Sequence, residues 1–128
     1  MGTGDLMGTR DFQIFVVRYV GDLTSGKFMN IAICMSEISG RDDRFLACQY
    51  TEEWDKLEVL FPNADIDFLK DWCEAVRKGF CSPDTNRMVQ EGLEDCSCNI
   101  DVSVSRRTLK ATDDPNEEMG KLFQVHPR

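Results

Sequence analysis

The sequence predicts a single α+β domain in which a mainly antiparallel four-stranded sheet is packed by two to four helices in two layers. Three observations lead to this prediction. The length of 128 residues suits one domain. The composition, 41% hydrophobic and 30% charged, is that of a globular protein. Segments rich in β-branched residues also occur beside segments whose apolar residues recur at helical spacing, and each kind offers the other a surface to bury.

The strands are expected early in the chain and again near its end. Residues 1–10 are rich in glycine and threonine and show no periodicity, so we expect a flexible tail followed by one domain over residues 11–128. Three segments dense in β-branched and aromatic residues, joined by short loops, predict antiparallel strands over 12–20, 28–37 and 44–50. A fourth strand is expected over 99–105, where apolar and polar residues alternate.

The helices are expected between the third and fourth strands and after the fourth. The clearest pattern covers residues 66–78, whose apolar residues, Trp72 among them, form one stripe. Asp65 is expected to cap this helix and Gly79 to end it. Shorter helices are expected over 53–61, between Pro83 and Gln90, and after Asp113-Asp114-Pro115.

Acidic residues outnumber basic ones by 23 to 15, which gives a net charge of −8. A phosphate-binding surface needs the opposite sign, so we expect no direct nucleic-acid binding. The excess is local, because residues 51–75 alone carry −6. This stretch is either a solvated surface that aids solubility, or a docking face for a basic partner or a mimic of nucleic-acid charge. The candidate docking residues are Glu52, Glu53, Asp55, Glu58, Asp67, Asp71 and Glu74.

The six cysteines do not predict disulfides. The N-terminal residues lack the basic and apolar regions of a signal peptide, so we expect a cytoplasmic protein with free thiols. Cys34, Cys48 and Cys73 lie in apolar patterns and are expected to be buried. Cys96 and Cys98 lack the second paired motif of a structural zinc site, so we expect no metal and no cofactor. No apolar run is long enough for a membrane span, and no membrane partner is expected.

The residue types of common catalytic sites are scarce. The one histidine, His126, is the third residue from the C-terminus, which argues against a Ser-His or Cys-His pair. Glycine-rich phosphate-binding motifs are absent. Asp67 and Asp71 are spaced as neighbours on one helix surface, where solvated acids are expected near a helix N-terminus. We therefore assign no catalytic residue.

The first two strands place polar residues in an apolar setting. In a symmetric hairpin around the loop 21–27, Arg18 falls opposite Asn30. Arg18 then shares a face with Ile14, and Asn30 is expected on the face of Ala32. Asp22 in the loop could neutralise Arg18.

Two interpretations of this hairpin remain open. A buried clamp would fix the register of the strands, because a buried arginine must be hydrogen-bonded. A functional site would instead use the arginine fork to bind an anion or a peptide, or would use a carboxylate as acid or base. The candidate binding residues are Arg18, Tyr19, Asp22 and Asn30.

Three motifs resemble a known family. They are Arg18-Tyr19 with Asp22, Gly26, Phe28 and Asn30-Ile31; Leu60-Phe61-Pro62-Asn63-Ala64-Asp65; and Ala111-Thr112-Asp113-Asp114-Pro115 followed by Leu122-Phe123. They are similar to the bacterial family catalogued as domain of unknown function 3037. Lys27 and Ala32 depart from its pattern, which has an acidic residue and a glycine there. The resemblance implies no established activity, and it implies genes that often lie beside a HipA-like kinase gene, as in toxin–antitoxin-like pairs.

We therefore expect a small non-enzymatic cytoplasmic interaction protein. The gene context that the resemblance implies suggests a regulator or subunit of a HipA-like kinase. Two alternatives are kept. One is a small enzyme with its site at the hairpin, which requires the four hairpin side chains to converge in an open pocket. The other is an acidic inhibitor or nucleic-acid mimic that binds a basic protein.

Overall fold

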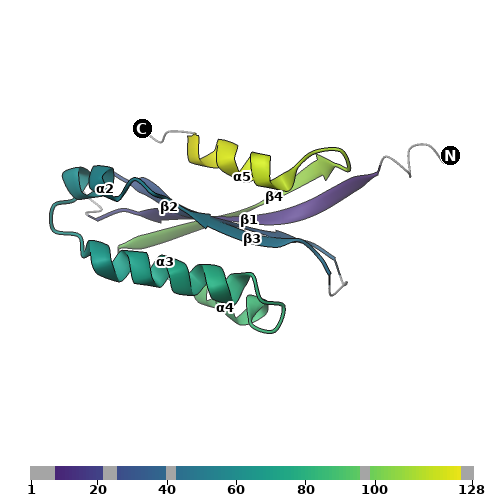
Figure 1. Ribbon diagram of the computed structural model, residues 1–128, viewed down its shortest axis with the longest axis horizontal. Coiled ribbons are helices and arrows are strands. Elements are labelled where there is room, and N and C mark those ends of the chain that lie inside the picture. The colour runs from purple at the N-terminus through teal and green to yellow at the C-terminus, as the bar shows by residue number, and fades with distance from the viewer. Residues whose placement is uncertain (1–7, 22–25, 40–42, 96–98, 125–128) are drawn as a thin grey trace.

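The computed structural model describes residues 8–21, 26–39, 43–95 and 99–124, which form one antiparallel sheet with helices on both faces (Figure 1). The strands are β1 (Thr9–Tyr19), β2 (Met29–Glu37), β3 (Leu46–Tyr50) and β4 (Ile100–Lys110), in the order β3-β2-β1-β4. The helices are α2 (Trp54–Leu60), α3 (Ile66–Phe80), α4 (Asn86–Glu94) and α5 (Pro115–Gln124). The predicted α+β class with four antiparallel strands is confirmed.

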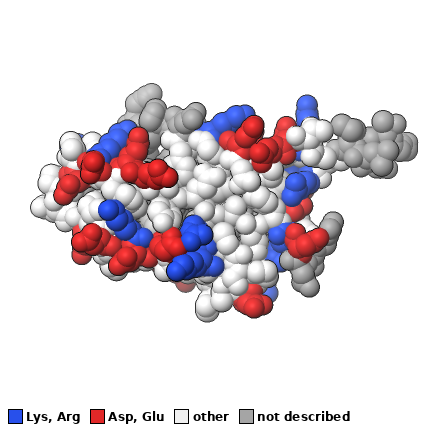
Figure 2. Space-filling model, viewed as in Figure 1, with Lys and Arg blue, Asp and Glu red and all other residues white. Residues whose placement is uncertain are grey.

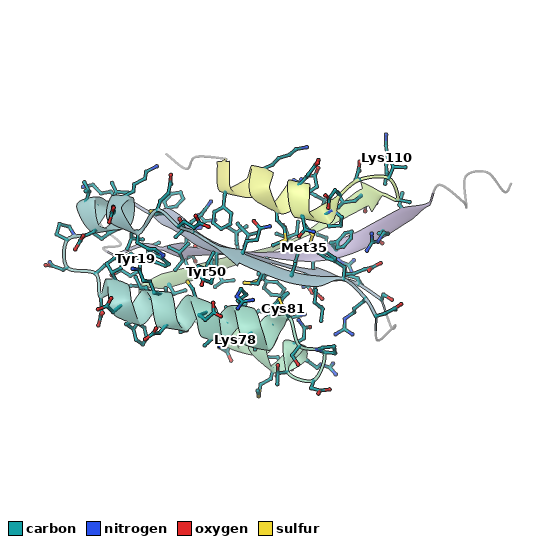
Figure 3. The ribbon with its side chains drawn as sticks, viewed as in Figure 1. Tyr19, Met35, Tyr50, Lys78, Cys81 and Lys110 are labelled. Carbon is teal, nitrogen blue, oxygen red and sulfur yellow. The ribbon has the colours of Figure 1, made fainter. Side chains whose placement is uncertain are left out.

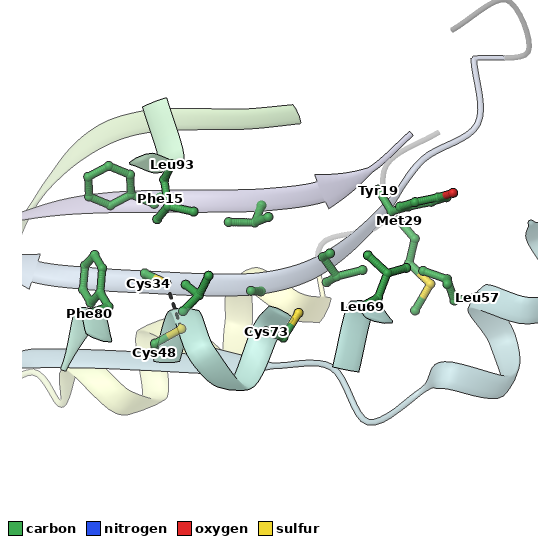
Figure 4. Close-up of a cluster of buried hydrophobic side chains, with 14 of the residues drawn as sticks. Phe15, Tyr19, Met29, Cys34, Cys48, Leu57, Leu69, Cys73, Phe80 and Leu93 are labelled. Atoms are coloured by element: carbon green, nitrogen blue, oxygen red, sulfur yellow. Dashed lines mark hydrogen bonds between the residues drawn. The ribbon is translucent and has the colours of Figure 1, made fainter. Parts of the chain in front are cut away.

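Helix α3 packs on one face of the sheet and builds the larger core with it. Asp65 caps the helix as predicted, because its carboxylate accepts a hydrogen bond from the backbone N–H of Phe68 at 3.1 Å. Cys73 and Phe80 are fully buried, whereas Trp72 is half-buried against the same core. Phe80 meets Phe15 of β1 edge to face, with ring centroids 5.6 Å apart (Figure 4).

The expectation that Gly79 ends the helix is wrong, because α3 continues to Phe80. The glycine instead allows α4 to approach. A Cβ atom added at Gly79 would lie 2.6 Å from Cγ2 of Val89, a distance that real side chains do not reach. Gly79 is therefore a packing residue of the α3–α4 contact, not a C-terminal stop.

Helix α5 covers the opposite face of the sheet and builds a second, smaller core. Met119 of the helix is fully buried with Phe12, Ile14 and Met35 of the sheet. Figure 3 shows Met35 on the α5 side, and Tyr19, Tyr50 and Cys81 on the α3 side. The helix starts at Pro115 as predicted. The fold therefore has a third layer beyond the two that were predicted, because α5 packs on the second face of the sheet.

The β1–β2 hairpin contains a β-bulge. Val17 pairs with Ala32 but Arg18 pairs with Asn30, so Ile31 is the additional residue. The predicted pairing of Arg18 with Asn30 is confirmed. The predicted face of Asn30 is wrong, because Val17 and Ala32 face α3 and the next residue of β1 points the other way. Asn30 therefore lies with Arg18 on the α5 side of the sheet.

Strands β1 and β4 are longer than predicted. Strand β4 continues to Lys110 instead of ending at residue 105, and β1 already begins at Thr9. Thr9 and Arg10 belong to the sheet, although the sequence placed them in the tail. Arg10 pairs with Glu37 of β2 through two hydrogen bonds of 3.2 and 3.1 Å. None of the helices in the described residues has the length and apolar composition that a bilayer-crossing segment requires.

Candidate functional site

The acidic stretch lies on α2, on the N-terminal part of α3 and on the residues before α2. We call its seven predicted members the acidic face: Glu52, Glu53, Asp55, Glu58, Asp67, Asp71 and Glu74. All are exposed except Glu74, which is half-buried. Figure 2 shows acidic side chains over α2 and along α3, with some basic side chains among them. The structure thus brings the predicted residues onto neighbouring elements of one surface.

A surface cleft of about 360 Å³ lies between α2 and α3. It forms because Pro62 cannot continue α2, and the turn 61–65 leads directly into the next helix. Its lining combines four carboxylates with three partly buried apolar side chains and one amine: Asp55, Glu58, Asp65, Asp67, Trp54, Ala64, Ile66 and Lys70. The cleft therefore offers a concave, strongly acidic surface with an aromatic component.

Glu74 differs from the rest of the acidic face because it is neutralised within the protein. Its carboxylate accepts a hydrogen bond from the Tyr50 hydroxyl at 2.7 Å and from Nε of Arg77 at 3.1 Å, and it also contacts Nη2 of Arg77. These hydrogen bonds, first that of Arg77 and then that of Tyr50, lower the pKa of Glu74 to about 2. The same contact with Glu74 raises the pKa of Tyr50. Glu74 therefore serves a local network at the edge of the acidic face.

Two exposed apolar residues directly follow acidic residues in the chain, and they were not identified from the sequence. Val59 of α2 is 79% exposed and follows Glu58, and Phe68 of α3 is 59% exposed and follows Asp67. The helical spacing contained the signal for Phe68, because it falls outside the stripe that the helix buries. Neither side chain lines the cleft itself, but large exposed apolar residues are typical of binding surfaces.

The candidate residues of the hairpin do not gather at one point. Arg18 points to the α5 side, where its guanidinium lies over the ring of Phe28, 4.8 Å from its centroid. Nη2 donates to Oγ of Ser103 at 3.3 Å, and Nε lies 3.5 Å from a carboxylate oxygen of Asp101. Asn30 shares this side of the sheet, and within the described residues no hydrogen bond joins it to Arg18. The predicted partner, Asp22, lies outside the described residues.

Tyr19 points to the other side of the sheet. It is 8% exposed, and its ring meets that of Phe61 edge to face with centroids 5.0 Å apart. Its hydroxyl accepts a hydrogen bond from the Asn99 amide at 3.4 Å. Arg18 and Tyr19 cannot line one pocket, since consecutive residues of a strand face opposite ways. Arg18 of β1 therefore links this strand to Asp101 and Ser103 of β4 and to Phe28, the residue before β2.

The described cysteines, Cys34, Cys48, Cys73 and Cys81, carry free thiols, as predicted. Cys34 and Cys48 face each other across β2 and β3, with their sulfur atoms 2.8 Å apart (Figure 4). Burial raises the pKa of Cys34, and it raises that of Cys73 to about 12, which disfavours the reactive thiolates. Cys96 and Cys98 lie outside the described residues. In the part of the chain that the structure describes, no three metal-ligating side chains are gathered for a metal ion.

A comparison with models of protein families shows which family this chain belongs to. Residues 15–126 match the family described as "Protein of unknown function (DUF3037)". The chain belongs to this family. No curated protein and no solved structure matches the chain. Its membership in the DUF3037 family confirms the family that the sequence resembles. Tyr19 and Phe61, which come from two of the three segments that carried the resemblance, meet in the core.

Proposed function

We propose that this DUF3037 member is a non-enzymatic interaction domain that docks a basic partner protein on its acidic face. The observation that carries the proposal is the cleft between α2 and α3, where carboxylates surround a tryptophan and exposed Phe68 and Val59 follow two of the lining acids. The proposal places this interaction in the cytoplasm.

The charges of the cleft support recognition of a basic surface. Within the described part of the chain, no basic side chain lies within 4.0 Å of the carboxylates of Asp55, Glu58 or Asp67. Their charge is therefore free to act on an approaching partner. Clustered charges of one sign steer association and select the partner more than they add affinity.

The exposed apolar side chains are expected to supply binding affinity, which the charges add to only weakly. An exposed phenylalanine costs solubility, and partners bind such residues as anchors because burying them removes a large apolar area from water. Phe68 lies three residues before Asp71 on α3, so an anchor and an acid share one helix surface. An apolar anchor with acidic neighbours fits a partner whose apolar pocket is ringed by lysine or arginine.

The first partner to test is a HipA-like kinase. The resemblance to the DUF3037 family implies that such genes often lie side by side, and two proteins of a toxin–antitoxin-like pair are expected to bind each other. In this proposal the DUF3037 protein is the regulator or subunit, and the kinase contributes the basic surface.

The experiment compares capture of partners from a lysate of the native host by the wild-type protein and by two charge variants. Asp55→Asn/Asp67→Asn removes two charges from the cleft. Asp84→Asn/Glu94→Gln removes two exposed charges elsewhere and is the matched control. We expect one stoichiometric partner with the wild type and the control, its loss with the cleft variant, and weaker capture as salt rises. Equal capture by all three proteins, or no stoichiometric partner, would overturn the proposal.

A further inference from the structure

The second feature of the molecule that suggests an interaction is the free edge of the sheet at β4, which lies away from the acidic face. In the order β3-β2-β1-β4 this strand has β1 as its one neighbour among the described residues. Its 11 residues are largely exposed, and Leu109 is the one that is buried. The opposite edge strand, β3, has five residues and is packed by α3.

The backbone hydrogen bonds at both ends of β4 show which groups are unpaired. Val20 N–H donates to the Asn99 carbonyl at 2.9 Å, and Ala111 N–H donates to the Gly8 carbonyl at 3.1 Å. The register between these two pairs is continuous. Hydrogen-bonded pairs alternate along an antiparallel ladder, so odd-numbered residues of β4 bond to β1. The even-numbered residues, from Ile100 to Lys110, direct their N–H and C=O groups outward.

We propose that this edge pairs with β4 of a second copy of the chain, antiparallel around a two-fold axis at Val104. In this register each even-numbered residue lies opposite an even-numbered residue, so the outward N–H and C=O groups of the two copies match. Ser103 lies opposite Ser105, and Val104 lies opposite itself. The product is one continuous eight-stranded sheet.

The charges on the strand favour this occupant and this direction. The first half of β4 carries Asp101, and the second half carries Arg106, Arg107 and Lys110. Antiparallel pairing at Val104 sets Asp101 of one copy opposite Arg107 of the other, whereas parallel pairing would set arginine against arginine. Within one chain Asp101 already lies 3.5 Å from Arg18, and Arg107 lies 2.8 Å from Glu118. Across the axis these pairs join into a row of alternating charge: Arg18, Asp101, Arg107, Glu118.

The centre of β4 has no proline, charge or bulge that would prevent it from pairing with the edge of another sheet. Proteins protect free edges with proline, a bulge or inward charges. Residues 102–105 read Val-Ser-Val-Ser, with no charge, no proline and no register shift against β1. Val104 is 40% exposed, and the axis brings the two copies of this side chain together. This inference does not depend on the proposed function, because it concerns a different surface.

Sedimentation velocity from micromolar to millimolar chain concentration tests the dimer. Val104→Lys sets two ammonium groups opposite each other at the axis, and we expect the dissociation constant to rise by about 100-fold or more. Val59→Lys makes the same change at an exposed valine of α2 and should leave the dimer intact. A wild-type protein that stays monomeric, or a Val104→Lys protein that still dimerises, would overturn the proposal.

Amide hydrogen exchange tests the register independently. In the wild-type dimer we expect protection of the N–H groups of Val102, Val104 and Arg106 as well as those of Ser103 and Ser105. In Val104→Lys the outward amides of Val102 and Arg106 should lose protection, while Ser103 and Ser105 keep theirs through β1. Unprotected even-numbered amides in a wild-type dimer would place its interface elsewhere and contradict the proposal.

Discussion

At the scale of single residues, Tyr19 and Phe61 show what two of the segments that resemble the family do in the fold. Their rings meet in the core, and Gly21, with φ of +59°, passes so close that a Cβ atom there would lie 2.5 Å from Cδ1 of Phe61. Asp65, in the same motif as Phe61, caps α3. These motif residues hold the hairpin, the turn between α2 and α3, and the start of α3 in fixed positions.

Arg18 is expected to act as a structural tie. Arg18→Met keeps the apolar stem and removes the guanidinium from Phe28, Asp101 and Ser103. Since a quarter of the side chain is exposed, we expect a loss of about 1–2 kcal/mol in the free energy of unfolding. Denaturant titration measures this loss, and capture of the partner should be unchanged. A fully stable Arg18→Met protein that no longer binds its partner would instead place the binding site at the hairpin.

Glu74 gives the fold a predictable dependence on pH. Its pKa is lowered from 4.5 to about 2 in the folded protein, so its contribution to stability is present above pH 4.5 and is lost as the pH falls toward 2. Thermal melts of the wild type and of Glu74→Gln should differ most at neutral pH and converge near pH 2. A difference that does not change with pH would contradict the ionised Tyr50–Glu74–Arg77 network.

The sequence predicted several single-residue contacts, and the reasons for its failures are physical. The pairing of Arg18 with Asn30 and the cap at Asp65 depend on local spacing, which a sequence contains. The bulge at Ile31 could not be predicted, because a symmetric pairing contains no signal for an additional residue, and the bulge turns Asn30 to the other face. The neutralisation of Glu74 comes first from Arg77, three residues along the same helix, and second from Tyr50, whose distance of 24 residues in the chain hides this partner from local patterns.

At the scale of elements, the contact between α3 and α4 depends on Gly79. Gly79→Ala would bring a Cβ atom against the stiff side chain of Val89, so we expect a loss of about 1–2 kcal/mol after the helix propensity gained. Gly92→Ala in α4 is the control. Its Cβ atom would meet open space, and we expect a gain of about 0.5–1 kcal/mol. Chemical denaturation measures both, and a Gly79→Ala protein as stable as Gly92→Ala would refute the close approach.

The elements with a strong local pattern were predicted and those without one were not. The stripe of α3 and the Asp-Asp-Pro start of α5 set these helices in the sequence itself. The second half of β4 has no alternating apolar residues, because its arginines and its edge position leave it exposed. This half is a strand because β1 extends far enough to pair with it. The residues that determine this pairing lie near the other end of the chain, so the local sequence does not reveal it.

At the scale of the whole molecule, the two proposed contacts use different parts of one sheet. Helix α3 packs on β3 and β2, whereas β4 lies at the other edge of the sheet (Figure 1). A dimer through β4 would leave both acidic faces open. Each copy could then bind its own partner, so variants at Val104 should change the oligomeric state without changing the affinity of each site.

The affinity of the purified partner for the Phe68→Ala protein tests the central claim most directly, because Phe68 is a 59% exposed aromatic residue and is not a member of either core. Met88→Ala, at a 66% exposed residue of α4, is the matched control. Titration calorimetry should show the dissociation constant of Phe68→Ala raised by about 10- to 100-fold, with Met88→Ala equal to the wild type. Equal affinity of Phe68→Ala and the wild type would show that the partner does not use Phe68 as its anchor and would contradict the proposed docking surface.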